Sequence, residues 1–331
     1  FERLVQPLVG GIYAGDPRQL SIESTFPRLR QMEREHRSLI RAMLRNSNTP
    51  PTESGARYGQ FKTLRGGLGT LIDALAARLP PGSIELNAAV AALLPGSEQR
   101  WRVQLDTSGR ESLEVDGVIV AAPAHQGGRL LAQADAELTA ELNKIEYASC
   151  AVVALGYERR QIRHPLDGFG FVVPLVEQRM ILSCSFSSVK YSGRAPDDCV
   201  LLRVFIGGAC QSGLLRLSRW ELGQLAAREV SGLLGIIGEP IVRRIVRQQQ
   251  AMPQYHVGHR QRVERIDARL KRFPTLALAG SGLYGVGVPR CVESAESAAE
   301  QILLQMSLLN QSNQRVPLRR SKSNRKEEVV G

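Results

Sequence analysis

The stretch GSGLYGVGV, residues 280–288, is the part of the sequence that best indicates the fold class. An apolar run at 276–279 precedes them and predicts a strand, and a helix is expected to follow to about residue 309. The first six residues match G-x-G-x-x-G, the pattern of a dinucleotide-binding turn. That pattern normally opens a βαβ unit, with an acidic residue about 20 positions further on. Here only one helix and a polar tail follow, so the stretch predicts the closing part of a nucleotide-binding sheet.

The glycines of this turn would give a ligand close access to the main chain. Gly285 and Gly287 have no Cβ atom to keep a bound molecule away. The helix that starts near Pro289 would present free N–H groups and the positive end of its dipole, which favour a phosphate or an electron-rich ring edge. The alternative is a glycine-rich connection between strand and helix that binds nothing.

Residues 53–124 alternate between strand and helix patterns. The run GVIVA at 117–121 is continuously apolar and predicts a central strand that is buried on both faces and ends near a ligand. Shorter strands are predicted at 84–86, 90–94 and 101–105, and helices across 124–144. Gly66 and Gly67 open an amphipathic helix whose apolar residues are expected to face inward: Leu68, Leu71, Ile72, Leu75 and Leu79.

The pattern changes between about residues 150 and 249. Turn residues, without intervening helices, separate four runs that predict an antiparallel sheet: 150–157, 169–173, 180–186 and 200–206. A helix at 219–234 is expected to cover this sheet, and 241–247 predict a further strand. Near the start, 27–45 predict one Arg-rich helix with an apolar face made of Leu29, Met32, His36, Leu39, Ile40 and Met43. The chain therefore predicts an α/β layer that an antiparallel insertion interrupts.

The composition limits the classes of function. The 331 residues, 43% of them apolar, suffice for two domains, and no run of 18 or more apolar residues predicts a membrane-spanning helix. Five scattered cysteines without a C-x-x-C pair favour a reduced, cytoplasm-like compartment. No metal site is expected, because His256 and His259 have no third ligand nearby and are interpreted as loop residues.

The charge distribution bears on possible partners. Part of the net charge of +11 lies in a basic run at 315–326, which predicts a disordered tail. Only 5% of the residues are aromatic and none interleaves with that run, so no nucleic-acid partner is expected. An anionic membrane surface is the better interpretation. The chain begins at Phe1 without a leader peptide, and we expect it to start inside a longer protein.

Seven segments, in this order, resemble the oxygen-dependent protoporphyrinogen oxidases of the flavin amine oxidase superfamily. They are GGIYAGDPRQLSIESTFPRL (10–29), LRGGLGTL (64–71), GFGFVVP (168–174), FSSVKYSGRAPDD (186–198), FIGG (205–208), PQYHVGH (253–259) and LAGSGLYGVGVPRCVESA (278–295). The first of them discriminates best against other amine oxidases. The family's amino-terminal glycine fingerprint, which holds the ADP half of FAD, and a basic residue for a substrate propionate have no counterpart here.

The resemblance implies a mixed α/β (α+β) fold. An incomplete FAD-binding Rossmann-like domain would carry an inserted antiparallel-sheet substrate domain and a helical membrane-facing segment. The implied boundaries are a helical segment at 1–52, FAD-binding parts at 53–124 and 250–309, a substrate domain at 125–249 and a disordered basic tail at 310–331.

The resemblance also implies roles for single residues. FAD would contact Val90 on its adenine side, and at its flavin end Met252, Val286, Gly287 and Val288. In the inserted sheet, Phe205 would stack on a pyrrole ring and Val172 would grip the macrocycle. Ser185 stands where the family often has a larger apolar residue. The apolar wall of the substrate pocket is expected to come from Phe169, Phe171, Val172, Leu182 and Phe205.

The implied activity is the FAD-dependent oxidation of protoporphyrinogen IX by molecular oxygen, in haem or chlorophyll synthesis. The flavin carries the chemistry, so no catalytic protein residue is expected. A more basic pocket would favour the tetracarboxylate coproporphyrinogen III, and another amine oxidase or desaturase activity is a broader alternative. In a different class, the chain would be a noncatalytic module on a membrane surface. We also expect a homodimer that is located in the cytoplasm or a plastid, at the periphery of a membrane.

Overall fold

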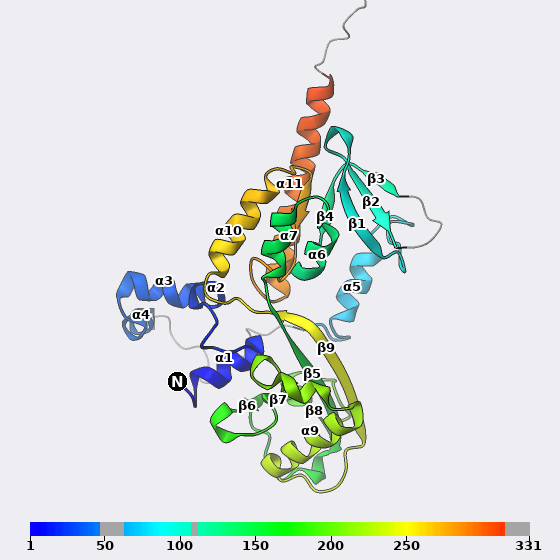
Figure 1. Ribbon diagram of the computed structural model, residues 1–331. Coiled ribbons are helices and arrows are strands. Elements are labelled where there is room, and N and C mark those ends of the chain that lie inside the picture. The colour runs from blue at the N-terminus through cyan, green and yellow to red at the C-terminus, as the bar shows by residue number, and fades with distance from the viewer. Residues whose placement is uncertain (47–62, 107–111, 315–331) are drawn as a thin grey trace, which may run out of the picture.

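The computed structural model describes residues 1–46, 63–106 and 112–314. Figure 1 shows two halves, which the long strands β5 (Tyr147–Glu158) and β9 (Val242–Pro253) connect. The lower half contains a sheet and helix α9 (Arg219–Leu234), and the upper half contains the glycine turn. The fold is mixed α/β with antiparallel sheets, as the sequence predicts.

A five-stranded antiparallel sheet forms the lower half. Its strands lie in the order β6 (Gly170–Val172), β7 (Ser183–Phe186), β8 (Cys199–Gly207), β5 and β9. These strands begin and end within a few residues of the predicted runs, except that β9 continues six residues further than expected, to Pro253. That extension brings the edge strand up to the loop before the glycine turn.

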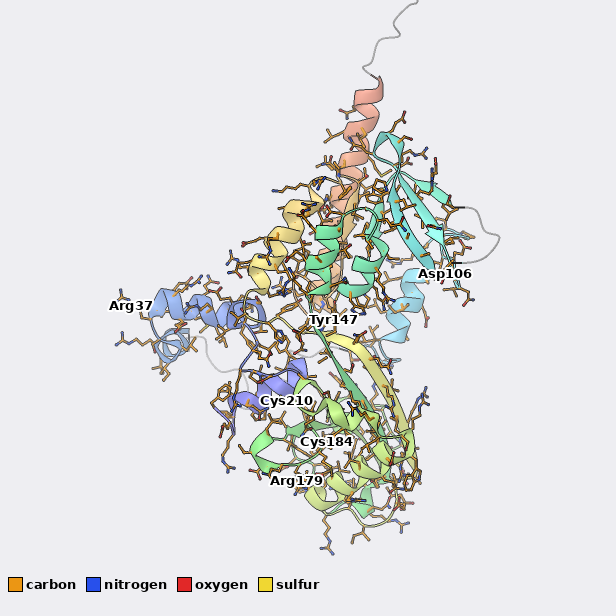
Figure 2. The ribbon with its side chains drawn as sticks, in the orientation of Figure 1. Arg37, Asp106, Tyr147, Arg179, Cys184 and Cys210 are labelled. Atoms are coloured by element: carbon orange, nitrogen blue, oxygen red, sulfur yellow. The ribbon has the colours of Figure 1, made fainter. Side chains whose placement is uncertain are left out.

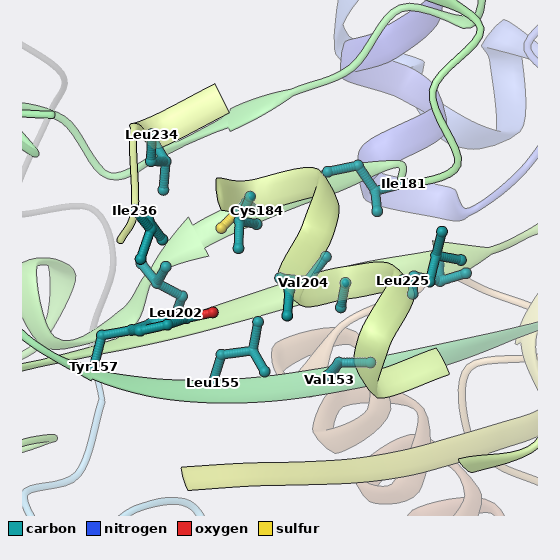
Figure 3. Close-up of a cluster of buried hydrophobic side chains, with 14 of the residues drawn as sticks. Val153, Leu155, Tyr157, Ile181, Cys184, Leu202, Val204, Leu225, Leu234 and Ile236 are labelled. Atoms are coloured by element: carbon teal, nitrogen blue, oxygen red, sulfur yellow. The ribbon is translucent and has the colours of Figure 1, made fainter. Parts of the chain in front are cut away.

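Helix α9 covers one face of this sheet. Its start is fixed by a capping box, in which Ser218 Oγ accepts the N–H of Glu221 and Glu221 accepts the N–H of Ser218, and Gly235 ends it in a left-handed conformation. Figure 3 shows the core between helix and sheet, with Leu225 close to Val153 and Val204. Burying such side chains stabilises the fold by about 1.5–3 kcal/mol each. This face of the sheet is therefore structural.

The upper half is built on a parallel pair of strands. Strand β4 (Val118–Val120) pairs with β10 (Leu276–Leu278), and helix α11 (Val288–Gln314) packs against both. A separate antiparallel sheet contains β1 (Val90–Pro95), β2 (Trp101–Leu105) and β3 (Leu113–Val115). The two sheets are linked where the buried Trp101 Nε1–H donates to Thr275 Oγ1 at 3.1 Å.

Three helices pack around these strands: α6 (Ala124–Leu130), α7 (Ala136–Asn143) and α10 (His259–Leu270). Asp135 caps α7 by accepting the N–H of Leu138 at 2.9 Å, and it also accepts hydrogen bonds from Arg269 of α10 at 2.8 and 2.9 Å. Burial alone would raise the pKa of Asp135, but these hydrogen bonds outweigh it and lower the pKa below its ordinary value. The ion pair between Asp135 and Arg269 fixes α10, and the first residue of α10, His259, lies beneath the glycine turn.

The remaining elements are short. They are the helices α1 (Val5–Tyr13), α2 (Ile22–Thr25), α3 (Pro27–His36), α4 (Leu39–Asn46), α5 (Gly69–Ala76) and α8 (Ser187–Lys190), and 3₁₀ turns at Ser97–Gln99, Arg159–Gln161, Leu175–Glu177 and Ala209–Arg216. Among the helices of the described ranges, none combines the length and the apolar character needed to cross a membrane.

The prediction of a single helix at 27–45 is wrong, because the structure has two helices there. The chain breaks at Arg37, which has a left-handed backbone (φ 55°), and α3 and α4 project as a pair with Arg37 at their tip (Figure 2). Ser38 explains the new start, because its hydroxyl accepts the N–H of Arg41 as an N-cap does. The side chain of Met43, which was expected on the apolar face, lies outside the described residues.

Two further expectations about burial are also wrong. The apolar face of α5 was predicted to point inward, but Leu68, Ile72, Leu75 and Leu79 are each more than half exposed. Strand β4 was expected to be buried on both faces, yet Ile119 is 40% exposed. Within the described ranges the apolar face of α5 is left largely exposed, and α11 covers Ile119 only in part.

Two element boundaries differ as well. The strand predicted at 84–86 is wrong, because these residues are irregular and pair with no strand of the described ranges. Helix α11 continues to Gln314, so 310–314 are helical, and the rest of the predicted tail lies outside the described residues.

Candidate functional site

The glycine turn follows strand β10 and leads into α11. Gly285 and Gly287 have φ values of +139° and +102°, which L-residues rarely adopt. A Cβ atom built on Gly287 would meet no heavy atom within 4 Å, so the main chain is open to a ligand on that side. The sequence therefore needs glycine here for its backbone conformation, and the conformation leaves space beside the turn.

A buried tyrosine holds the turn from beneath. The hydroxyl of Tyr255 donates to the carbonyl oxygen of Ser281 at 2.6 Å and accepts the N–H of Gly285 at 2.9 Å. Burial raises the pKa of Tyr255, which keeps the hydroxyl protonated and able to donate. At the other end, Ser294 Oγ of α11 accepts the N–H of Gly280 at 2.9 Å. The turn is thus fixed at three positions.

Two more aromatic side chains support this arrangement. The ring of His259 stacks on Tyr255 with centroids 3.9 Å apart, and its Nε2 lies 3.0 Å from the carbonyl oxygen of Leu283. Tyr147 lies at the junction of the two halves in Figure 2, and its hydroxyl oxygen accepts the N–H of Ala124 at 2.9 Å. The same oxygen would lie 2.7 Å from a Cβ atom built on Gly282. His259 is buried in the first turn of α10, so its interpretation as a loop residue is wrong.

The charge state of His259 follows from its surroundings. Burial lowers its pKa, and the nearby Arg262 acts in the same direction, although the contact with Leu283 opposes them. A neutral ring with the proton on Nε2 donates to the Leu283 carbonyl and leaves no buried positive charge. The support beneath the turn is therefore neutral at physiological pH.

His259 is expected to make stability depend on pH. The folded state has the lower pKa, so as pH falls through the unfolded value near 6.5 the unfolded chain takes up the proton first, at about 1.4 kcal/mol per unit of pKa difference. Stability is full above pH 6.5 and declines below it. Urea unfolding between pH 5 and 8 should show a smaller decline for His259→Gln, while His36→Gln, on α3, should keep the decline. An unchanged slope in His259→Gln would contradict the neutral assignment.

The first turn of α11 offers hydrogen-bond donors. Within the described ranges, the N–H groups of Gly287 and Val288 make no hydrogen bond, as is usual for the first residues of a helix. Such groups, with the positive end of the helix dipole, favour an anion or an electron-rich ring edge. A cavity of about 400 Å³ opens beside the turn, lined among others by Tyr13, Phe26, Tyr284, Val286 and Arg290. The turn thus borders a space that a ring system could enter.

The residues predicted to contact FAD lie in two places. Val286, Gly287 and Val288 are in the turn and at the start of α11. Met252 pairs with Ala148, next to the pair of Tyr147 with Pro253, so it lies where the five-stranded sheet approaches the turn. Val90 lies apart, at the start of β1 in the separate three-stranded sheet. Its role stays a prediction.

The face of the five-stranded sheet opposite α9 carries the predicted substrate residues. The strand registers place Val172, Ser183, Phe205, Val152 and Val246 in one row across all five strands. A parallel row contains Gly170, Ser185, Arg203, Ala154 and Arg244. We call this surface the open face. One row is thus mainly apolar, and the other contains two arginines.

Three of the five predicted substrate residues share this face: Val172, Ser185 and Phe205. Leu182 is buried, and its side chain lies 3.2 Å from the position that a Cβ of Gly208 would take, near the end of α1. Phe169 is half-buried next to β6, with the Lys190 ammonium 6.0 Å from its ring centroid. The structure thus brings three of these residues onto one surface and places the other two at its margins.

Phe171 was expected in the same apolar wall, and that expectation is wrong. Its side chain points to the other face, where it packs against the core with its ring centroid 6.1 Å from that of Phe186. The cause is strand alternation, because Phe171 lies between Gly170 and Val172, whose partners are on the open face.

Sequence reasoning missed Tyr255, His259, Arg203 and Arg244. Strand alternation could have found the arginines, since Arg203 is two residues before Phe205 and Arg244 is two residues from both Val242 and Val246, on the same face of a predicted strand. Tyr255 and His259 lie in the segment PQYHVGH, which carries the resemblance, but their contacts with the turn depend on the tertiary fold.

Residues 1–303 match the family described as flavin containing amine oxidoreductase. The chain is 32% identical over 308 residues to coproporphyrinogen III oxidase of Bacillus subtilis, covering 91% of this chain and 64% of the relative. It is 35% identical over 315 residues to protoporphyrinogen oxidase of Bos taurus, covering 89% and 64%. The chain therefore spans a little less than two thirds of the length of these relatives.

A solved structure gives the same picture. The crystal structure of a protein from Exiguobacterium, provisionally assigned as a protoporphyrinogen oxidase, superposes with a TM-score of 0.78 at 31% identity, over 92% of this chain and 64% of that one. The similarity thus extends over both halves of the fold.

Proposed function

Because the chain belongs to the flavin containing amine oxidoreductases, we propose that the protein carrying it oxidises a porphyrinogen with bound FAD. The cofactor of this family is a flavin. The observation that carries the proposal is the position of the open face: from Val152 and Val246 of its apolar row, β5 and β9 continue to the pair of Ala148 with Met252, where the sheet approaches the glycine turn. A large apolar macrocycle on this face would lie on the same pair of strands that extends toward the turn.

The residues of the turn fit a flavin cofactor. Gly287 leaves its main chain open, and the unpaired N–H groups at the start of α11 can donate to a ring edge or a phosphate. When bound, FAD supplies the hydride acceptor, and molecular oxygen is the proposed final oxidant. Tyr255, His259 and Ser294 hold the turn, so the donors keep fixed positions. The work of this chain is to position the reactants and to exclude water.

The open face is suited to a porphyrinogen. Phe205, Val152 and Val246 give a large apolar macrocycle a surface on which to pack, with the aromatic ring at its centre. We propose protoporphyrinogen IX or coproporphyrinogen III as the substrate. The pair of arginines in the adjacent row favours coproporphyrinogen III, which has four carboxylates instead of two. The peripheral membrane location, cytoplasmic or plastid, and the homodimer stay predictions.

The activity can be measured directly. The protein, produced from its native gene, is expected to bind FAD, with absorption near about 450 nm, and to convert a colourless porphyrinogen into a fluorescent porphyrin. The assay compares protoporphyrinogen IX and coproporphyrinogen III with a neutral tetraester, under oxygen and under nitrogen. Flavin binding without any gain of fluorescence would refute porphyrinogen oxidation but leave the family assignment intact.

A further inference from the structure

We infer that Arg203 and Arg244 bind the carboxylates of the substrate and select macrocycles that carry more of them. The inference rests on the proposed function, because it assigns substrate contacts within the same open face. The resemblance to the porphyrinogen oxidases implies no role for these two arginines. They would be specificity-determining residues and take no part in the chemical step.

The register of the sheet places the two arginines together. Ala154 of β5 pairs with Arg203 on β8 and with Arg244 on β9, so the arginines flank this small residue on one face. In the next row on that face, Val152 lies between Phe205 and Val246. Rows two residues apart are separated by about 6.8 Å, and the strands β8 and β9 by about 9.6 Å. A macrocycle packed on the apolar row would therefore direct short acidic side chains toward the arginine row.

Arg203 and Arg244 are exposed, and neither makes an ion pair with an acidic side chain among the described residues. The rows of the open face contain no aspartate or glutamate. The guanidinium carbon of Arg203 lies 5.4 Å from the centroid of the Phe205 ring, so this cation is held over the apolar row rather than extended into solvent. The positive charge of the face is thus available to a ligand.

Arginines on the covered face of the same sheet behave differently. Arg243 makes an ion pair with Glu239 at 2.9 Å, and Arg247 donates to the carbonyl oxygens of Leu215 and Leu217. Two arginines of β9 thus have partners on the covered face, whereas Arg244 has none among the described residues. Exposed surface arginines are common, but here the unpaired ones flank the row predicted to receive an apolar ring.

The chemistry of the guanidinium group suits this role. Its planar donors can bind a carboxylate through two parallel hydrogen bonds, which a solvent-exposed lysine would not do as specifically. The binding requires no covalent or redox step. A substrate with four carboxylates can reach both arginines in more orientations than one with two, so loss of the arginines should affect the tetracarboxylate more.

The test uses Arg203→Gln, Arg244→Gln and the double variant in the protein produced from its native gene. Arg228→Gln, an exposed arginine on α9 at the covered face, is the matched control. In the double variant, KM for coproporphyrinogen III should rise by at least about tenfold with kcat within about twofold. KM for protoporphyrinogen IX should rise less, and KM for coproporphyrinogen tetramethyl ester should not change. The single variants should show intermediate effects, and Arg228→Gln none.

A second measurement does not depend on turnover. Binding of the product coproporphyrin III, followed by fluorescence quenching, should weaken by a similar factor in the double variant, while binding of its tetramethyl ester should stay the same. Equal losses for acid and ester, or no loss for either, would overturn the role of the arginines. If the wild-type protein binds coproporphyrin III through the arginines but oxidises no porphyrinogen, the proposed function fails and the assignment of the carboxylate site survives.

Discussion

Tyr255→Phe is expected to lower the free energy of unfolding by about 2–3 kcal/mol and to reduce the FAD content of the purified protein. The tyrosine hydroxyl makes two hydrogen bonds to the main chain of the glycine turn, with Ser281 and Gly285. Its removal leaves a carbonyl and an N–H group unpaired in a largely buried place, and each unpaired group costs about 1–3 kcal/mol. Phenylalanine keeps the stacking on His259, so the change isolates the hydroxyl.

Urea unfolding and the ratio of flavin to protein absorption measure both effects. Tyr284→Phe is the matched control, because Tyr284 lies in the same turn but is 47% exposed and donates only to Asp267. It should cost less than about 1 kcal/mol and lower the flavin content less than Tyr255→Phe does, because the Tyr284 ring that lines the cavity is kept. Equal effects of the two substitutions would show that the Tyr255 hydroxyl does not hold the turn.

Gly285→Ala is expected to destabilise the folded protein by about 1–3 kcal/mol and to weaken FAD binding by about tenfold or more. The backbone of Gly285 has φ +139°, and a Cβ atom there would lie 2.9 Å from Cγ of Arg290. Arg290 can move, but the backbone conformation stays costly for alanine. Relaxation of the turn would pull the N–H of residue 285 away from Tyr255 and shift the donors at the start of α11.

Gly232→Ala is the control, because it is expected to stabilise the protein where Gly285→Ala destabilises it. Gly232 lies inside helix α9 with ordinary helical geometry, and no atom lies within 4 Å of a Cβ built on it. Alanine should therefore stabilise the protein by up to about 1 kcal/mol without changing its flavin content. Thermal unfolding and flavin titration distinguish the two glycines. Unchanged FAD affinity in Gly285→Ala would separate the turn from the cofactor site.

The sequence predicted those parts of the fold whose signals are local. The strands of the antiparallel sheet could be found because apolar runs alternate with turn residues, and α9 because its apolar residues repeat at helical spacing. The break at Arg37 was missed because the apolar periodicity on its two sides is continuous. Only the capping residue Ser38 indicated a new helix.

Burial was harder to predict than secondary structure. Periodicity identifies the apolar face of α5, but it does not say whether another element covers that face, and here none of the described ones does. The same limit applied to the candidate site. The glycine turn was visible in the sequence. Its support by Tyr255 and His259 was not, because these contacts join residues 24 to 30 positions apart and arise only on folding. Likewise, Arg203 and Arg244 became neighbours only through the register of β5.

The paired strands β5 and β9 also set limits on internal motion. Their ladder runs from Gly156 and Val242 to Tyr147 and Pro253, and thus extends from the sheet to the region beside the turn. Sliding one half of the molecule along the other would break many of these hydrogen bonds together. Twisting or bending the ribbon disturbs these hydrogen bonds much less, and we expect bending to be easiest at the irregularity between Ala148 and Cys150. Fluctuations should therefore tilt a ring on the open face relative to the turn while hardly changing the distance between them.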